Sequence, residues 1–187
     1  EDKRVLVDAS FGPGKMGPRA VFYECCKYGW TALQGDDKEY FSIIDKRTGL
    51  SKRRLYGKMQ FGDPLIGQKK GQPQYDAKLM KMRVCPLFRW SNPGVKDILE
   101  NLSRKRGVSW EIPMDIPNEW HKHMAAEVKK VEKSSSTGRP VAKYVQVKRD
   151  NHYRDVELML LVAMLIARLL PSDFESHLVD DAEITAS

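Results

Sequence analysis

The sequence predicts an α/β protein in which helices pack against a central sheet. A short β-branched segment at Lys3–Ala9 precedes a helix-patterned segment at Arg19–Tyr28 and a second short apolar segment at Thr31–Gln34. Strand, helix and strand joined by short connections favour a parallel pair in an α/β sheet. Near the other end, Asp150–Leu170 predicts a helix with ten consecutive apolar residues, Leu158–Ala167, too few to span a bilayer. We expect this helix to be packed on every side.

Composition and charge describe a globular chain with a basic surface. The 187 residues suit one domain, residues 1–170, and an acidic tail, residues 171–187, which we expect to be mobile. Because the tail holds five acids and no Lys or Arg, the positive surplus behind the net charge of +7 lies in the domain. Such a surplus favours a polyanionic partner, and a merely soluble basic surface is the alternative.

The cysteines exclude a disulfide scaffold. Cys25 and Cys26 are adjacent and Cys85 stands alone, which matches neither a disulfide framework nor a CxxC metal site, so a reducing cytosol is expected. The sequence contains no signal peptide and no apolar segment long enough for a membrane span, so no membrane partner is expected. Because the first residue is Glu1 and a buried strand begins close to it, we expect the chain to be a piece of a longer one.

The remaining elements are predicted from their periodicity and their turn residues. Gly and Pro at residues 12–18 predict a turn, and residues 39–75 predict irregular structure with one or two hairpins. The later elements are, in chain order, a strand at Ala77–Cys85, a helix at Asn92–Lys105, an amphipathic helix at Asn118–Lys133, an exposed turn at Ser134–Pro140 and a strand at Val141–Lys148.

Two patterns give weak indications of other chemistry. Gly12, Gly14 and Gly17 satisfy the GxGxxG spacing of a dinucleotide-binding loop. Prolines in and after this loop remove amide donors that would hold a pyrophosphate, and no further alternating βα units follow, so nucleotide binding is a minor alternative. His121 and His123 are two residues apart on a predicted helix and point to different sides, which does not favour a metal site.

Acids at the ends of buried segments are the candidate metal ligands. Asp8 ends the first predicted strand, and Asp155 lies in the first turn of the apolar helix, where a purely structural role is the alternative because helix N-termini favour Asp. If both carboxylates meet at one sheet edge, they supply the oxygen ligands of Mg²⁺ or Mn²⁺, and two such ions can cleave a phosphodiester. His152, near Asp155, is a candidate for the same site or a capping residue. Asp36 and Asp37 are interpreted as turn residues.

Five sequence motifs occur in a distinctive order between Arg4 and Leu165. They are RVLVDASF, GWTALQGDD, RWSNPGVKDIL, EWHKHMAAE and VQVKRDNHYRDVELMLLVAML. This ordered set resembles the C-terminal nuclease domain of tailed-phage terminase large subunits, which are DNA-packaging motors. That family closes with an Asn and, a few residues later, an Asp that opens an apolar helix; Asn151 and Asp155 match this pattern.

The resemblance implies an RNase H-like fold, with a central mixed sheet flanked by helices and acids that bind two Mg²⁺ or Mn²⁺ ions. It implies a two-metal endonuclease that cuts concatemeric phage double-stranded DNA during packaging in the host-cell cytoplasm. The terminase small subunit and the portal protein would be its partners. By motif position, Asp155 is the acid on the C-terminal helix and Asp8 the acid on a central strand, with Asn151 and His152 beside the metal ligands.

This chain departs from the family pattern at its beginning. The family has an earlier hairpin of strands with a further Asp, and the segment that matches RVLVDA lies at the very start here. We therefore expect the nuclease fold to lack its N-terminal strands, which leaves the activity of this fragment alone open. No Walker motif is present, so ATP hydrolysis is not expected.

Two basic segments are expected to contact DNA phosphates with little sequence preference. The rival hypothesis is a non-catalytic DNA-binding or portal-docking module in which the acids are only helix and strand ends. The basic residues are Lys46, Arg47, Lys52, Arg53, Arg54 and Lys58 in a segment interleaved with aromatic residues, and Arg139, Lys143, Lys148 and Arg149 around the last strand.

Overall fold

A computed structural model describes residues 5–10, 18–44, 46–62, 85–104, 110–133, 138 and 140–170. The described residues form two compact units, the first made chiefly of residues up to Asn92 and the second of Pro93–Leu169, and each unit is described by itself. Several predicted features lie outside the described residues: Gly12, Gly14 and Gly17, most of the strand predicted at Ala77–Cys85, most of the turn at Ser134–Pro140 including Arg139, and the acidic tail.

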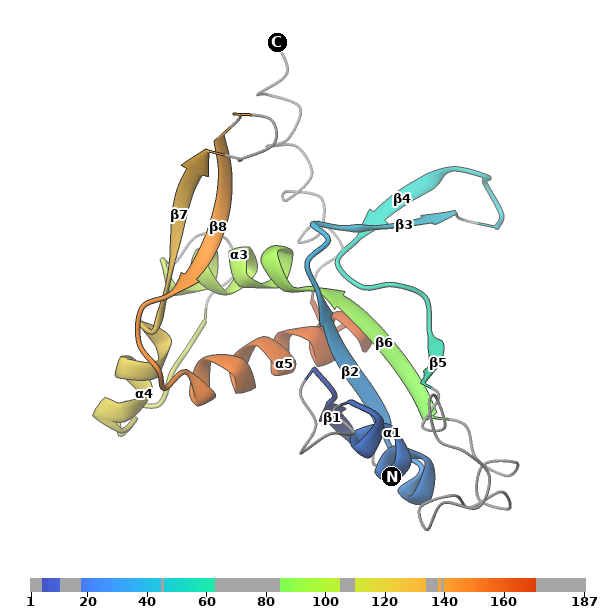
Figure 1. Cartoon of the computed structure of the whole chain (residues 1–187), viewed down its shortest axis with the longest axis horizontal. Helices are drawn as coiled ribbons and strands as arrows, with labels where there is room; N and C mark the ends of the chain where they lie inside the picture. Colours follow the sequence, from blue (N-terminus) through green and yellow to red (C-terminus); the bar gives the residue numbers. More distant parts are fainter. Residues whose placement is uncertain are drawn as a thin grey trace. The chain divides into compact units, whose positions relative to one another are not determined.

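The first unit contains a four-stranded mixed sheet (Figure 1). β1, β2 and β6 are parallel neighbours in this order, and β5 is antiparallel to β6. The predicted parallel pair is therefore confirmed, and the fold is of the mixed α/β kind. The bounds of the four strands are Leu6–Asp8 for β1, Thr31–Asp36 for β2, Cys85–Ser91 for β6 and Gln60–Gly62 for β5.

Helix α1 (Pro18–Tyr28) connects β1 to β2 and packs against the sheet. It ends at Gly29, whose φ of +72° allows the N–H of Trp30 to bond to the carbonyl of Cys25 at 2.9 Å. This tight helix end lets β2 begin at once and return alongside β1. The buried core of the unit consists of Ala9, Phe22, Cys25, Cys26, Ala32, Cys85 and Leu87.

One of the hairpins predicted after β2 is confirmed. β3 (Phe41–Ile44) and β4 (Ser51–Arg54) pair antiparallel, and Gly49, with a φ of +70°, lies in their connection. The hydroxyl of Ser91 donates to the carbonyl of Glu39 at 2.7 Å. This bond ties the start of the β3–β4 hairpin to the end of β6.

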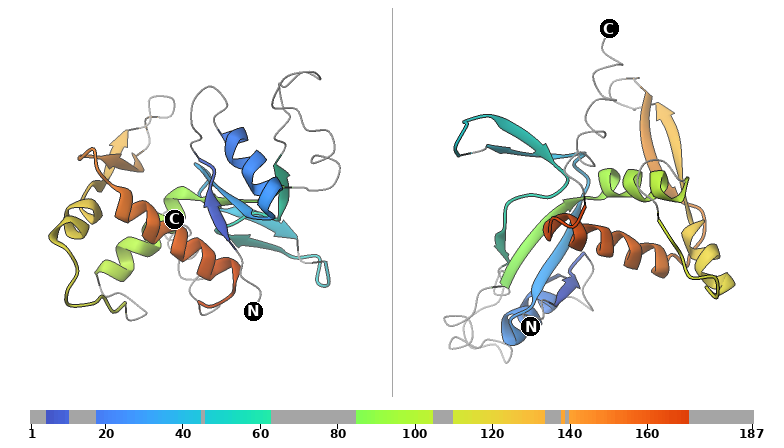
Figure 2. Two further views of the ribbon diagram at one scale, coloured as in Figure 1. Left: turned by 90° about the horizontal axis from the view of Figure 1, so that it is seen from below. Right: turned by 180° about the vertical axis from the view of Figure 1, so that it is seen from behind.

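The second unit combines helices with an antiparallel ribbon of two strands (Figure 2). We call this pair, β7 and β8, the β7–β8 ribbon. α4 packs against α5. The elements of the unit are α3 at Asn92–Ser103, α4 at Asn118–Met124, β7 at Glu127–Lys133, β8 at Pro140–Gln146 and α5 at His152–Ile166.

The helix predicted over Asn118–Lys133 is wrong in its second half. The helix stops at Met124, and β7 follows after a short turn. Val128 and Val131 are three residues apart, which fits a helical pattern and explains the expectation. The strand is instead specified by its pairing with β8 along its full length. Such a long-range contact is absent from the local pattern.

The predicted apolar helix is confirmed as α5, but the expectation that it is packed on every side is wrong. Leu158 is 2% exposed, whereas Val156 and Leu160 are 56% and 55% exposed. The last two lie four residues apart and therefore share one face of the helix. α5 packs through its Leu158 side, and the described residues leave the face of Val156 and Leu160 open to solvent.

Candidate functional site

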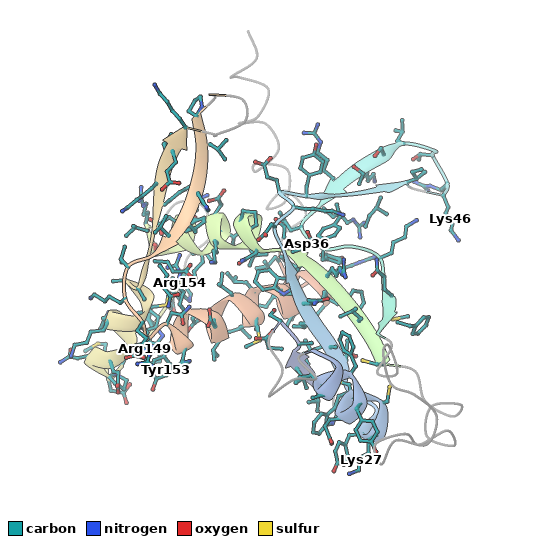
Figure 3. All side chains as sticks on the ribbon, viewed as in Figure 1. Lys27, Asp36, Lys46, Arg149, Tyr153 and Arg154 are labelled. Atoms are coloured by element: carbon teal, nitrogen blue, oxygen red, sulfur yellow. The ribbon has the colours of Figure 1, made fainter. Side chains whose placement is uncertain are left out.

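The carboxyl ends of three parallel strands form one edge of the first unit's sheet. Asp8, Asp36 and Ser91 are the last residues of β1, β2 and β6, and the register places Asp36 opposite Ser91. Figure 3 shows Asp36 at the end of β2. Ligands of α/β sheets bind at this kind of edge. Asp8 therefore occupies the strand-end position that the sequence predicts.

Ser10, in the turn after β1, bonds both to the Asp8 carboxylate and to the neighbouring strand β2. Oδ1 of Asp8 accepts the N–H of Ser10 at 2.9 Å. Oγ of Ser10 in turn accepts the N–H of Gly35 at 3.2 Å. Asp8 is partly buried and is fixed by this chain of contacts.

Asp36 acts as a turn residue and also as an ion-pair partner. Its Oδ1 accepts the N–H of Lys38 at 3.1 Å, the contact of an Asx turn, and its Oδ2 lies 3.7 Å from Nη1 of Arg89. Asp37 is exposed. Sequence reasoning missed that β2 extends as far as Asp36, three residues beyond Leu33, the residue of β2 that pairs with Asp8. The available signal was an acid two residues after the predicted strand.

In the second unit, Asp155 lies in the first turn of α5 and is held by Asn151. The side-chain amide of Asn151 donates to Oδ1 of Asp155 at 3.2 Å, and the N–H of Asp155 donates to the carbonyl of Asn151 at 3.1 Å. The carboxylate is partly buried. Asn151 therefore orients the carboxylate directly, in agreement with its predicted place beside the candidate ligand.

The histidines near this site contact one another and the helix start. Nδ1 of His123 accepts the N–H of Tyr153, in the first turn of α5, at 3.4 Å, and its ring centroid is 5.9 Å from that of His152. His121 instead packs edge-on against Trp120, with centroids 5.1 Å apart. The two members of the HxH pair thus have different surroundings, as their spacing predicts. His152 is exposed at the start of the helix.

The carboxylates of both units have the donor chemistry that suits a hard cation. Asp8 and Asp36 in the first unit, and Asp155 in the second, offer the carboxylate oxygens that Mg²⁺ and Mn²⁺ prefer. Across the part of the chain that the structure describes, no three His, Cys, Asp or Glu side chains are gathered around a common point. The pairing of Asp8 with Asp155 joins residues of different units and stays a prediction.

A buried group of charges at the base of the β7–β8 ribbon was not predicted. Arg154 and Lys96 both pair with Oε2 of Glu127, at 3.3 Å and 2.7 Å. Nη1 of Arg154 also donates to the carbonyl of Met124 at 2.8 Å. Next to this group, the Tyr144 hydroxyl and Nζ of Lys129 both donate to Oδ1 of Asp97 at 2.6 Å. We call these residues the ribbon-base cluster.

Tyr144, in the ribbon-base cluster, has a perturbed pKa. Burial raises the pKa of Tyr144 well above its ordinary value, and the hydrogen bond to Asp97 and the charge of Asp97 raise this pKa further. The neutral hydroxyl is therefore the form that the fold favours. The side chains of Lys96, Lys129 and Arg154 lie 5.6, 5.7 and 5.8 Å from the ring centroid of Tyr144.

The first predicted basic segment lies on and beside the β3–β4 hairpin. Arg53 stacks over Tyr40 at 4.5 Å, and Arg54 lies 5.8 Å from the ring centroid of Tyr56 and donates to its hydroxyl at 3.3 Å. The interleaved aromatic residues thus support the basic side chains. Lys46 projects near the tip of the hairpin in Figure 3. The exposed basic residues of this segment are Lys46, Arg47, Lys52, Arg53 and Lys58.

The second basic segment is part of the β7–β8 ribbon and of the turn that follows it. Lys143 of β8 lies directly opposite Lys130 of β7, and both are exposed. Like charges facing each other across an antiparallel pair destabilise it, and an anion bound between them would relieve the repulsion. Lys148 and Arg149 are exposed in the turn before α5. Lys130 was missed because its segment was predicted to be helical.

Comparison with known proteins gives no assignment. No protein-family model, no curated protein and no solved structure matches this chain. Separately, none of the helices among the described residues combines the length and the apolar character needed to cross a membrane.

Proposed function

We propose that this chain is the nuclease part of a metal-dependent endonuclease that cuts double-stranded DNA. The observation that carries the proposal is the position of Asp155: a partly buried acid in the first turn of an apolar helix, with its carboxylate oriented by Asn151. Asp8, at the carboxyl end of a central parallel strand, is the second proposed ligand. The resemblance to terminase nuclease domains adds a biological role, the cutting of concatemeric phage DNA during packaging in the host cytoplasm.

In the proposed reaction, different residues bind the metal, orient the carboxylates and hold the DNA. Asp8 and Asp155 would hold Mg²⁺ or Mn²⁺, which supplies an activated water and stabilises the leaving oxygen of the phosphodiester. Ser10 and Asn151 fix the two carboxylates before any ligand binds. The exposed basic residues of the β3–β4 hairpin and the β7–β8 ribbon would hold the DNA through its phosphates, which gives affinity without sequence selection. The portal protein and the terminase small subunit are the proposed partners.

Plasmid nicking tests this proposal. We expect nicking with Mg²⁺ or Mn²⁺, none in EDTA, and a loss of about a hundredfold or more in Asp155→Asn. Asp150→Asn, which removes the same charge from an exposed position just before the helix, is the matched control and should nick at nearly the wild-type rate. Cleavage by Asp155→Asn, or cleavage that EDTA does not change, would refute the proposal.

A non-catalytic DNA-binding or portal-docking module is the second candidate. The facing pair of Lys130 and Lys143 favours it, because an anion such as a DNA phosphate would relieve the repulsion between the two lysines. Neither lysine is a candidate metal ligand. The module would bind DNA in a salt-sensitive way, with no effect of Mg²⁺ or Mn²⁺ and no cleavage. The nicking assay and a binding titration with and without metal therefore separate the two candidates.

A further inference from the structure

Arg154 is a buried charged residue of the second unit. It precedes Asp155 in the first turn of α5, and it is only 3% exposed. Its guanidinium bonds to the carbonyl of Met124, at the end of α4, and to Glu127, at the start of β7. Arg154 therefore joins the start of α5 to two other elements of the same unit, and Figure 3 places it where these elements meet.

A contribution to the stability of the fold does not explain why Arg154 is buried. A positive charge in the first turn of a helix opposes the helix dipole. Nη2 of Arg154 is buried and finds no acceptor among the described residues. A buried ion pair is often no more stabilising than apolar side chains of similar volume. The arrangement is costly, so a role in fixing geometry explains it better than a role in stability.

The geometry that Arg154 fixes is the rotational setting of the first turn of α5. Successive residues of an α-helix are about 100° apart around the axis, so holding one side chain sets the direction of the next. Arg154 is held through two bonds from different elements, and its guanidinium carbon lies 5.8 Å from the ring centroid of Tyr144, on β8. With this side chain anchored, the direction of Asp155 relative to the β7–β8 ribbon is set before any ligand arrives.

We propose that Arg154 is a positioning residue, which holds the first turn of α5 so that the Asp155 carboxylate and the lysines of the β7–β8 ribbon act on the same DNA. The inference rests on the proposed function of Asp155 as a metal ligand. Asn151 orients the carboxylate through its own hydrogen bond, and Arg154 orients the turn that carries both residues. The partner residue Glu127 is necessary for this role because it balances the buried charge.

Three variants separate positioning from stability. Arg154→Met removes the anchor, and the triple variant Arg154→Met, Glu127→Met and Lys96→Met replaces all three paired charges by apolar side chains, which should recover the stability lost in the single variant. Lys96→Met is the matched control, because it removes the other cation of Glu127 and leaves the contacts of Arg154 in place. The unfolding midpoint of each variant is measured by circular dichroism.

The first readout is hydrogen exchange of the Asp155 amide, compared with amides later in α5. We expect exchange to be about tenfold faster in both Arg154→Met variants and within about twofold of wild type in Lys96→Met. The second readout is plasmid nicking, for which we expect kcat to fall about tenfold to a hundredfold in both Arg154→Met variants, with KM little changed. The triple variant should regain its unfolding midpoint without regaining kcat.

Three results would overturn the inference. They are unchanged exchange at Asp155 in Arg154→Met, recovery of kcat together with stability in the triple variant, or an equal loss of kcat in Lys96→Met. If the wild-type protein does not nick DNA with any metal, the proposed function fails instead. The exchange measurement then still decides whether Arg154 holds the first turn of α5, because it does not depend on activity.

Discussion

The pKa of Tyr144, in the ribbon-base cluster, depends on both its burial and the charges around it. Its hydroxyl donates to Asp97, and its ring lies among three cationic side chains. Burial is the largest cause of its raised pKa, followed by the hydrogen bond and the charge of Asp97. The folded state therefore opposes ionisation of this tyrosine, whereas the unfolded chain allows it near pH 10.

Stability should accordingly fall at alkaline pH through Tyr144. Because its pKa is raised by folding, its contribution is complete below about pH 10 and is lost as the pH rises above that value. We expect Tyr144→Phe to cost about 1.5–3 kcal/mol at pH 8, from the hydrogen bond to a charged group, and to lose less stability than wild type between pH 8 and pH 11. Urea unfolding at the two pH values measures this. Equal losses in the two proteins would contradict the assignment.

At the level of single residues, the sequence predicted the ends of elements better than the buried charges. Asp8 was identified because it directly follows an apolar segment, and Asp155 because it lies within three residues of one; such positions can be recognised from the sequence alone. Arg154, Glu127 and Lys96 have no such signal, since charged residues are usually exposed and only tertiary contacts bury them.

Among the elements, α5 shows that apolar composition does not determine the number of packed faces. Ten consecutive apolar residues predicted burial all round, yet one face is open to solvent. The period of 3.6 residues still decides which side chains are inside, because Leu158 and Leu160 point in different directions. The packing of α5 is therefore asymmetric.

Alanine substitutions should reveal this asymmetry. We expect Leu158→Ala to destabilise the protein by about 2–5 kcal/mol, as for a large side chain removed from a core, because Leu158 is 2% exposed. Leu160→Ala, only two residues away and 55% exposed, should change the free energy of unfolding by no more than about 0.5 kcal/mol. Chemical denaturation measures both. Similar costs at the two positions would show that the open face of α5 is in fact packed.

The β7–β8 ribbon offers a substitution with opposite effects on stability and on DNA binding. Lys143→Glu places opposite charges across the ribbon from Lys130, and should stabilise it by roughly 0.2–1 kcal/mol. The same change should weaken DNA binding and reduce its dependence on salt concentration, because a phosphate contact is lost. Lys27→Glu, an exposed change of equal charge on α1, is the control and should leave the salt dependence unchanged. Unaltered DNA affinity in Lys143→Glu would exclude the ribbon from the DNA-binding surface.

Elements specified by local sequence were predicted more reliably than those specified by pairing. The β1–α1–β2 segment follows from a short strand, a helical pattern and glycine after the helix, all within about 30 residues. β7 depends on β8, and valines spaced three apart gave the wrong period. The same error hid Lys130 and Glu127, since their positions on a strand determine which residues they face.

For the whole molecule, the proposed function depends on two acids that belong to different units. Asp8 belongs to the first unit and Asp155 to the second, and each is fixed by a neighbouring hydrogen bond within its own unit. The proposed mechanism requires both carboxylates to hold the same metal site. The basic hairpin of the first unit and the β7–β8 ribbon of the second would then act on one DNA duplex.

Crystals soaked in manganese test this claim most directly, because Mn²⁺ can be located by its anomalous scattering. The proposed function predicts an Mn²⁺ ion bound by carboxylate oxygens of both Asp8 and Asp155, and its loss in Asp155→Asn. Soaked crystals in which neither acid binds the ion would contradict it.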